Sequence, residues 1–407
     1  ILAQAVGSSL VVLSFTTMKS ATLVGACFAV AGAARPCKQP SAVGCIEPSI
    51  EETDWDTLWS SYQEQFGKTY DDSVSADARR EIWHQNMLYI MMENEKDSAY
   101  SLGVNQFTDL TKEEFTSTYL GYKPQNMSKS GTTLGRLHYD GDVLDLPSDW
   151  DWSESSVEVV TPVKDQGSCG SCWSFSATGA LEGALAVGNG WTQTMSEQQI
   201  LDCDTGGGAC NGGEPSQALN WEKAENVCSE DSYPYTSGSG GGGGGGSYSS
   251  YAADLGSAGC SSSGCSAVLT VGSIYGAYSV DADEGSHCAA VIQRPLSVCV
   301  DASSNSFQSY SSGIYSDCGT STDHAILLVG YGYYNNNPYW KVKNSWATSW
   351  GISGYMLISR PSGSGDGTCG IQSDTNGVYV YGPYNPSLQI RGADGEFIEE
   401  PVRKTLV

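Results

Sequence analysis

The residues best suited to covalent chemistry surround one cysteine. Residues 166–175, with the sequence QGSCGSCWSF, place Cys172 at the start of a predicted helix, 173–187, that is rich in small residues. Free backbone N–H groups and the helix dipole at such a position stabilise an anion, so the pKa of a thiol there can fall from about 8.5 to roughly 3.5–7.5. A thiolate is a good nucleophile, and this position therefore suits covalent catalysis. The Gln166 amide and the Cys172 backbone N–H could together form an oxyanion hole.

Cys169 and Cys172 also form a C-x-x-C pair, which is typical of redox dithiols and of zinc sites. A redox dithiol is expected in a thioredoxin-like βαβ setting, and the surrounding pattern lacks one. A zinc site needs a second pair of Cys or His ligands at suitable spacing, and none follows in the sequence. We therefore predict neither a metal nor a cofactor.

Only four histidines occur in the chain, so few residues can serve as the base for this thiol. His324 directly precedes an apolar predicted strand, which places its imidazole at the mouth of that strand. Asn344 follows a second predicted strand and can accept a hydrogen bond from the imidazole, and Trp346 could shield that bond from water. The alternative base, His287, lies in a polar stretch where we expect it to be solvated. A purely structural histidine at a strand end is the alternative interpretation of His324.

The helices and strands that must position these residues are predicted in different parts of the chain. Apolar residues recur at spacings of three and four through 54–94, which predicts two consecutive helices. Thr111 and Glu114 form a capping box, which predicts the start of another helix. An alternating pattern predicts a short strand at 100–107, and runs of strand character predict further strands at 297–300, 325–331, 339–343 and 355–359. Predicted helices dominate the N-terminal part of the chain and predicted strands the C-terminal part, which indicates an α+β fold.

Composition excludes several classes of protein. The chain has 407 residues, with 46 acidic and 20 basic side chains and a formal net charge of -26. Such an acidic excess argues against nucleic-acid binding, which needs a basic surface, and it disfavours docking to an anionic membrane. The 14 cysteines indicate an oxidising compartment.

The N-terminal region has the pattern of a secretory signal peptide. The sequence opens with Ile1, and we predict a start at Met18, followed by one lysine, the apolar run 21–31 and small residues at 31–34. The alternative is a signal anchor, because 1–34 carries a single charge and is long enough to span a bilayer. Asn126 begins the one ordinary glycosylation sequon.

Taken together, these residues resemble the papain-like cysteine proteases of the cathepsin L type, whose C-G-S-C-W signature is followed far downstream by a His and an Asn. The resemblance covers residues 52–380. Six positions match the interrupted motif of the family's inhibitory propeptide, although Ser75 stands where that motif begins with glutamate: Arg79, Ile82, Trp83, Asn86, Ile90 and Asn94. Residues 103–109 (GVNQFTD) match a second propeptide motif, and 146–150 (LPSDW) is similar to the start of a mature enzyme.

The resemblance implies a papain-like two-lobed fold, with a helical left lobe and a β-barrel-like right lobe, behind a helical inhibitory prodomain. It divides the chain into a signal region (1–34), a linker (35–51), a helical inhibitory propeptide (52–120), a propeptide linker (121–145), a peptidase domain (146–380) and a C-terminal extension (381–407). The propeptide linker has little pattern from residue 126 onward, and we expect that part to be exposed.

By the same resemblance, Cys172 is the nucleophile, His324 the general acid/base, Asn344 the residue that orients the imidazole and Gln166 the oxyanion donor. Ala347 departs from the family, which usually has glycine at that position.

The resemblance also implies a substrate site. Gly212 and Gly213 correspond to the strip whose backbone pairs with the substrate, and Trp346 supports the site. The S2 pocket, which binds the second residue before the cleaved bond (P2), is assigned to Glu214, Pro215, Cys299, Thr322, Ala325 and Asp374. We hypothesise that Asp374, with Glu214, lets this pocket accept arginine as well as bulky apolar side chains. The alternative is that either carboxylate points to solvent.

The disulfides implied by the resemblance are Cys169–Cys210, Cys203–Cys260 and Cys318–Cys369. Cys228 and Cys265 form a plausible further pair, although Cys260 and Cys265 could exchange roles. The pairing of Cys288 and Cys299 stays open.

We therefore predict the zymogen of a cysteine endopeptidase of the secretory pathway, either lysosomal or vacuolar or extracellular. Its partners are polypeptide substrates and its own propeptide, which acts as an intramolecular inhibitor until acidic pH promotes its removal. We expect a monomer with no nucleic-acid partner and no membrane contact once mature. The alternative function is a catalytically silent papain-fold binding or storage protein.

Overall fold

The computed structural model describes residues 53–124, 134–239, 260, 264–380 and 390–391. The predicted signal region, the glycosylation sequon at Asn126 and nearly all of the C-terminal extension therefore lie outside the described residues. The chain divides into two compact units, 1–65 and 66–407. In the first, helix α2 (Trp55–Phe66) stacks the rings of Trp59 and Tyr62 at a centroid distance of 5.6 Å. Across the described residues, every helix is too short or too polar to cross a membrane.

The second unit begins with the remaining elements of the predicted propeptide. Helix α3 (Ser73–Asn94) starts where Asp72 accepts a hydrogen bond from the Ser75 backbone at 2.7 Å. Helix α4 (Lys112–Tyr119) has the predicted capping box of Thr111 and Glu114. The strand predicted at 100–107 is shorter than expected, since β1 covers only Tyr100–Leu102 and the chain then turns.

One long sheet carries most of the apolar core. Its order is β1-β8-β11-β10-β9-β7-β12-β6-β2-β13, and β3 (Trp150–Asp151) pairs with β9. The predicted strands appear in it with modest shifts at their ends. Its remaining members are β2 (Arg136–Leu137), β6 (Ile274–Val280), β7 (Leu296–Val300), β8 (Tyr310–Tyr315), β9 (His324–Tyr334), β10 (Asn337–Lys343), β11 (Tyr355–Ser359), β12 (Thr375–Val380) and β13 (Ile390–Arg391).

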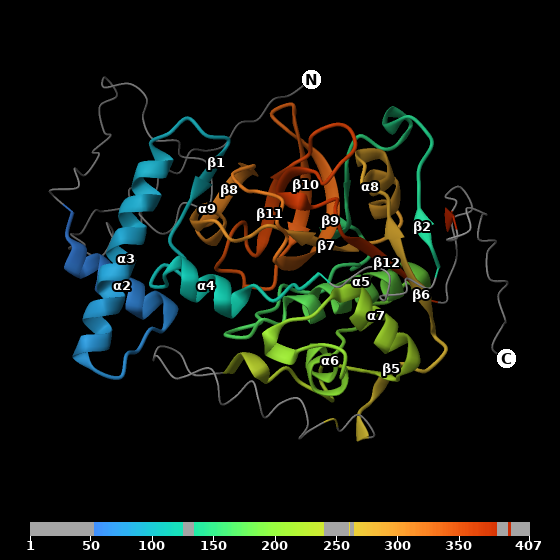
Figure 1. Cartoon of the computed structure of the whole chain (residues 1–407), viewed down its shortest axis with the longest axis horizontal. Helices are drawn as coiled ribbons and strands as arrows, with labels where there is room; N and C mark the ends of the chain where they lie inside the picture. Colours follow the sequence, from blue (N-terminus) through green and yellow to red (C-terminus); the bar gives the residue numbers. More distant parts are fainter. Residues whose placement is uncertain (1–52, 125–133, 240–259, 261–263, 381–389, 392–407) are drawn as a thin grey trace, which may run out of the picture. The chain divides into compact units, whose positions relative to one another are not determined.

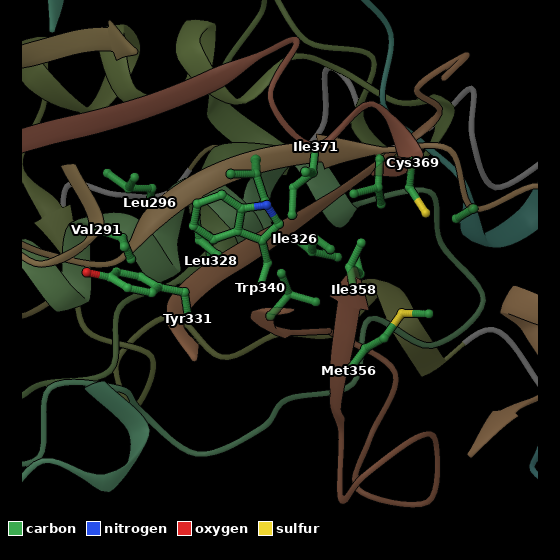
Figure 2. Close-up of a cluster of buried hydrophobic side chains, with 14 of the residues drawn as sticks. Val291, Leu296, Ile326, Leu328, Tyr331, Trp340, Met356, Ile358, Cys369 and Ile371 are labelled. Atoms are coloured by element: carbon green, nitrogen blue, oxygen red, sulfur yellow. The ribbon is translucent and has the colours of Figure 1, made fainter. Parts of the chain in front are cut away.

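Strand β9 is buried along most of its length because both of its faces are covered. On one face, Trp340 packs among Ile326, Leu328 and Ile358, as Figure 2 shows. On the other face, Leu327 and Val329 pack against helix α5. A near-continuous apolar strand is the pattern expected for burial on both sides, and this burial fixes the position of His324 at the start of the strand.

Helix α5 (Cys172–Asn189) is the centre of the helical layer, which Figure 1 shows in green beside the orange strands. Its side chains from Cys172 to Ala186 are all buried, against α6 (Glu197–Cys203), α7 (Pro215–Ala224), β9 and β12. Small residues are required at this packing distance: a Cβ on Gly183 would lie 2.7 Å from the Pro295 ring. The described residues thus confirm the α+β class. The shorter elements are α9 (Asn305–Gln308) and the pair β4 (Val227–Cys228) and β5 (Ala267–Leu269).

The expectation that His287 is solvated is wrong. Residues 284–291 form helix α8 (Glu284–Val291), with Asp283 as its N-cap, and this helix buries the imidazole completely. The ring nitrogens lie 2.8 Å from the Asp283 carbonyl oxygen and 2.7 Å from the Thr375 hydroxyl. Burial lowers the pKa of His287 to about 4, so this residue is a neutral structural histidine.

The disulfides follow the implied pattern. Cys169–Cys210, Cys203–Cys260 and Cys318–Cys369 are all bonded, and so is Cys228–Cys265, which the sequence left open. Three cysteines are free and buried in the described part of the chain: Cys172, Cys288 and Cys299.

Part of the propeptide linker differs from expectation. Leu134 and Leu137 are buried in the same apolar cluster as Trp340, and β2 pairs with β6. The linker that we expected to be exposed therefore contributes β2, residues 136–137, to the main sheet.

Candidate active site

Cys172 is the first residue of α5, as predicted, and its thiol is completely buried. The backbone N–H of Gly121, in the propeptide linker, donates a hydrogen bond to the sulfur at 3.3 Å. Desolvation raises the pKa of the Cys172 thiol to about 11, against the opposing effect of the Ala325 and Gly121 backbone N–H groups. The sequence suggested a lowered pKa from the helix terminus. In this covered state, loss of water outweighs that effect.

His324 is oriented by two contacts. Its Nε2 lies 2.8 Å from Asn344 Oδ1, and its ring stacks on the Trp346 indole with centroids 4.4 Å apart. Asn344 Oδ1 also accepts the Ser345 backbone N–H at 2.8 Å. Because that N–H can only donate, the amide oxygen must face His324, and Nε2 must carry the proton. The neutral ring therefore keeps its lone pair on Nδ1.

Burial also sets the charge of this imidazole. Desolvation lowers the pKa of His324 to about 4, although the Asn344 hydrogen bond opposes it. Its Nδ1 is buried and has no hydrogen-bond partner among the described residues. Ala325, the next residue, packs in one apolar cluster with Cys172, so the base and the thiol belong to the same site.

Gln166 is held in one orientation. Its Oε1 accepts hydrogen bonds from the Ser345 hydroxyl at 2.7 Å and from the Trp346 indole N–H at 3.1 Å. An indole N–H only donates, so the amide nitrogen must face the opposite way. That nitrogen donates to the carbonyl oxygens of Cys169 at 2.7 Å and Tyr119 at 3.0 Å. The backbone carbonyl of Tyr119, the last residue of α4, thus occupies the donor predicted for an oxyanion.

The chain segment 121–123 runs along Gly213 beside the cysteine. The Gly213 N–H donates to the Gly121 carbonyl at 2.9 Å, and the Lys123 N–H donates to the Gly213 carbonyl at 3.0 Å. Side chains would prevent this approach: a Cβ on Gly121 would collide with the Gly170 carbonyl, and a Cβ on Gly213 would lie 2.6 Å from Trp173. Gly212, at φ 104°, faces the Gly121 carbonyl directly. The predicted glycine strip therefore binds a backbone.

Tyr122 fills the predicted S2 pocket. Its ring packs with Cys299 and Ala325, and its hydroxyl donates to Asp374 Oδ2 at 2.6 Å. Burial, with the nearby Cys299 and Asp374, raises the pKa of Tyr122, which keeps the hydroxyl protonated as a donor. The sequence did not identify Tyr122, because nothing in its local pattern distinguishes it from other linker residues.

Neither acidic residue of this pocket points to solvent. Asp374 is buried, and its Oδ1 accepts from the Asn376 side chain at 2.8 Å. Glu214 is also buried but is engaged in capping α7, since its carboxylate accepts the backbone N–H groups of Ser216 at 3.1 Å and Gln217 at 3.2 Å. Burial first, and then the charge of Asp374, raises the pKa of Glu214. Asp374 is therefore the carboxylate that meets a side chain in the pocket.

The other two residues assigned to this pocket are Pro215 and Thr322. Pro215 is the first residue of α7, and Thr322 lies in the turn before β9 and packs against Gly370. The sequence also missed the role of Ser345, which orients Gln166. Its position between Asn344 and Trp346 was the available signal.

One group of possible metal ligands exists in the described part of the chain. His138, Asp281 and Asp283 place ligand atoms within 4.8 Å of one another. These groups already have partners, however: Arg136 pairs with Asp281 at 3.3 Å, and Asp283 caps α8. They contact neither the thiol nor the imidazole of the candidate site.

Comparison with known proteins agrees with this geometry. The model of the papain family cysteine protease matches residues 146–379, and the cathepsin propeptide inhibitor domain (I29) matches residues 59–115. Procathepsin L of Mus musculus is 35% identical over 348 residues, which cover 81% of this chain and 95% of that protein. Cysteine proteinase RD21A of Arabidopsis thaliana is 36% identical over 321 residues, 77% of this chain but only 64% of that protein, so the chain spans less than two thirds of its length.

A solved structure extends the likeness to the precursor form. The recombinant stem bromelain precursor superposes with a TM-score of 0.69 at 32% identity, and it covers 80% of this chain and 99% of that one. The expected two-lobed fold behind a helical prodomain is thereby confirmed.

Proposed function

Because the chain belongs to the papain family of cysteine proteases and carries that family's propeptide inhibitor domain, we propose that it is the latent form of an endopeptidase that cleaves polypeptides through Cys172, His324 and Asn344. The observation that carries the proposal is the pair of hydrogen bonds to the propeptide. Gly121 N–H is bound to the thiol, and the Gln166 amide is bound to the Tyr119 carbonyl. A peptide segment thus already occupies the nucleophile and the oxyanion donor.

The roles follow from the hydrogen bonds. His324 holds its proton on Nε2 through Asn344, and its free Nδ1 can take the Cys172 proton. The thiolate then adds to the substrate carbonyl carbon, while Gln166 Nε2 and the Cys172 backbone N–H stabilise the oxyanion. The imidazolium returns its proton to the leaving amine as the C–N bond breaks, and water hydrolyses the resulting thioester with the same imidazole as base.

Latency has an electrostatic component besides the steric one. With a pKa of about 11, the thiol stays protonated at any lower pH. With a pKa of about 4, the imidazole stays neutral at any higher pH. The thiolate–imidazolium pair is therefore suppressed across the physiological range until the propeptide leaves and water returns.

We propose that acidification releases the propeptide through its own ion pairs. Lys68 and Tyr70 donate to Asp109 at 2.7 and 2.9 Å, and Arg79 donates to Glu114 at 2.6 Å. Burial of Glu114 opposes its ionisation, but the hydrogen bonds from Arg79 and Thr111 prevail and lower its pKa. A lowered folded-state pKa stabilises the fold above the unfolded value, and this stabilisation is lost as the pH falls through the folded value.

The S2 pocket should select by charge. Once Tyr122 leaves, Asp374 stands as a buried carboxylate beside Cys299 and Ala325, which suits either a basic P2 side chain or a bulky one with a polar tip. Asp374→Ala should reduce cleavage of substrates with arginine at P2 and preserve cleavage of those with phenylalanine at P2. Equal loss on both, or loss on neither, would contradict this assignment.

We place the enzyme in the secretory pathway. The argument rests on the signal-like region 1–34 and on four disulfides, which persist in oxidising compartments.

The deciding experiment compares the purified precursor with its Cys172→Ser variant before and after acid incubation. Peptidase activity that appears only in the wild type, together with loss of the inhibitory segment, supports the proposal. Persistent silence in folded, trimmed wild-type protein would favour the binding or storage alternative.

A further inference from the structure

Strand β2 precedes the peptidase domain in sequence and yet is an interior strand of the peptidase sheet. It pairs in parallel with β6, which places Leu137 opposite Val280, and it pairs antiparallel with β13, which places Ile390 opposite Leu137. Figure 1 shows β2 alongside β6. Departure of a strand that has a partner on each side would leave two edges of unpaired N–H and C=O groups.

The residues around β2 are anchored by apolar burial and by the backbone. Leu137 is 0% exposed and Leu134 is 8% exposed, in the core cluster that also holds Val280 and Trp340. Three backbone hydrogen bonds join this stretch to β6 and the residue after it: Leu134 N–H to Ala277 O at 3.1 Å, Ser279 N–H to Gly135 O at 3.0 Å and Asp281 N–H to Leu137 O at 3.0 Å.

Polar contacts continue the attachment beyond the strand. Arg136 pairs with Asp281 at 3.3 Å, and His138 Nδ1 lies 2.9 Å from the same carboxylate. The Tyr139 N–H donates to the buried Ser286 hydroxyl at 3.0 Å, at the start of α8. The turn formed by residues 143–145 also packs on α8.

These contacts are separate from those of the inhibitory segment. Residues 119–123 contact Cys172, Gln166, Gly213 and Asp374. Residues 134–139 contact β6, α8 and β13. Uncovering the active site therefore requires that the first set of contacts break and leaves the second set undisturbed.

We propose that the segment from Leu134 to Asp145 stays on the enzyme as a strand of its sheet after the inhibitory segment is released, instead of leaving with it. This inference rests on the proposed function, because it concerns the product of activation. It also revises the sequence-based expectation that the whole of 121–145 is a linker to be removed.

Activation of the wild-type precursor provides the first test. After acid activation and gel filtration, the active fraction is denatured, and its mass and N-terminal sequences are determined. We expect residues 134–145 in that fraction, as an N-terminal extension or as a bound peptide. An active fraction that begins near Leu146 and contains no 134–145 peptide would overturn the proposal.

A second test needs no peptidase activity, so it separates this inference from the proposed function. In the Cys172→Ser precursor, the Arg136–Leu137 bond should resist trypsin, since both residues lie within β2. Adding Leu137→Asp should speed cleavage about ten-fold or more, because proteolysis follows local opening. Adding Leu144→Asp, at a side chain in the same segment that is 83% exposed, should leave the rate unchanged. Rapid cleavage in the Cys172→Ser precursor itself would contradict retention even if the enzyme proves active.

Discussion

The contact between Tyr122 and Asp374 should control how tightly the precursor is closed. Tyr122→Phe removes only the hydroxyl that donates to Asp374 Oδ2 at 2.6 Å and keeps the ring that packs on Cys299 and Ala325. A hydrogen bond to a carboxylate in a buried site contributes about 1.5–3 kcal/mol. At about 1.4 kcal/mol for each factor of ten, the open fraction of the precursor should rise about 10- to 150-fold.

The assay is the initial rate of hydrolysis of a small peptide substrate by intact precursor near neutral pH, before any propeptide cleavage is detectable by mass spectrometry. Since only open molecules bind substrate, this rate should rise with the open fraction, up to that of the activated enzyme. Tyr119→Phe is the matched control, because it removes a tyrosine hydroxyl from the same segment that lies beside Ser168 and not beside Asp374. The reasoning fails if Tyr122→Phe leaves the rate unchanged, or if Tyr119→Phe raises it equally.

Three further substitutions test other parts of the structure. Ala347 holds φ at 57° next to Trp346, a conformation that L side chains rarely adopt. Ala347→Gly should therefore raise the unfolding free energy by roughly 0.5–1 kcal/mol in denaturant titrations, and a loss would show that this conformation carries no strain. Glu222 is buried, and neither of its carboxylate oxygens has a hydrogen-bond partner among the described residues. Burial raises the pKa of Glu222 well above its ordinary value, so the free energy of unfolding should fall as the pH rises and this carboxyl must ionise. Glu222→Gln should therefore flatten the fall in melting temperature between acidic and neutral pH, and an unchanged slope would contradict this reasoning. Arg79→Gln removes the partner that lowers the pKa of Glu114, so the midpoint of acid activation should move to higher pH. The midpoint is measured as activity against incubation pH, and an unchanged midpoint would exclude this ion pair as part of the trigger.

Local sequence patterns predicted the elements that depend on local physics. The capping box at Thr111 gives a helix start because its two hydrogen bonds join residues only three apart. The run of small residues after Cys172 predicts a buried helix, and α5 is one. The strands at 325–331 and 339–343 are long enough for their apolar character to be distinctive, and both occur with extended ends.

Features that depend on distant partners escaped prediction. The stretch around Leu134 and Leu137 has too few apolar residues to show a period, and it becomes a strand only because β6 offers an edge more than a hundred residues away. His287 followed an interpretable N-cap at Asp283, but the Gly-Ser pair between them favoured a loop by propensity. Tertiary packing overrode that preference and buried the helix.

Cys172, the proposed nucleophile, illustrates why a motif alone cannot give the protonation state of a side chain. Its place at the start of α5 was evident from the sequence, and a helix N-terminus does favour a thiolate. Yet the stretch 119–122, where α4 ends and the predicted linker begins, places the Gly121 N–H on the sulfur, the Tyr119 carbonyl on Gln166 and the Tyr122 ring in the predicted S2 pocket. Burial raises the pKa of the thiol and lowers that of His324, and this stretch covers the thiol itself. Removing that segment should therefore restore both ionisations together, so reactivity of Cys172 toward a small alkylating reagent should rise in step with peptide hydrolysis during activation. If the thiol reacted rapidly in the intact precursor, burial could not be the cause of latency, and steric exclusion of substrate alone would have to account for it.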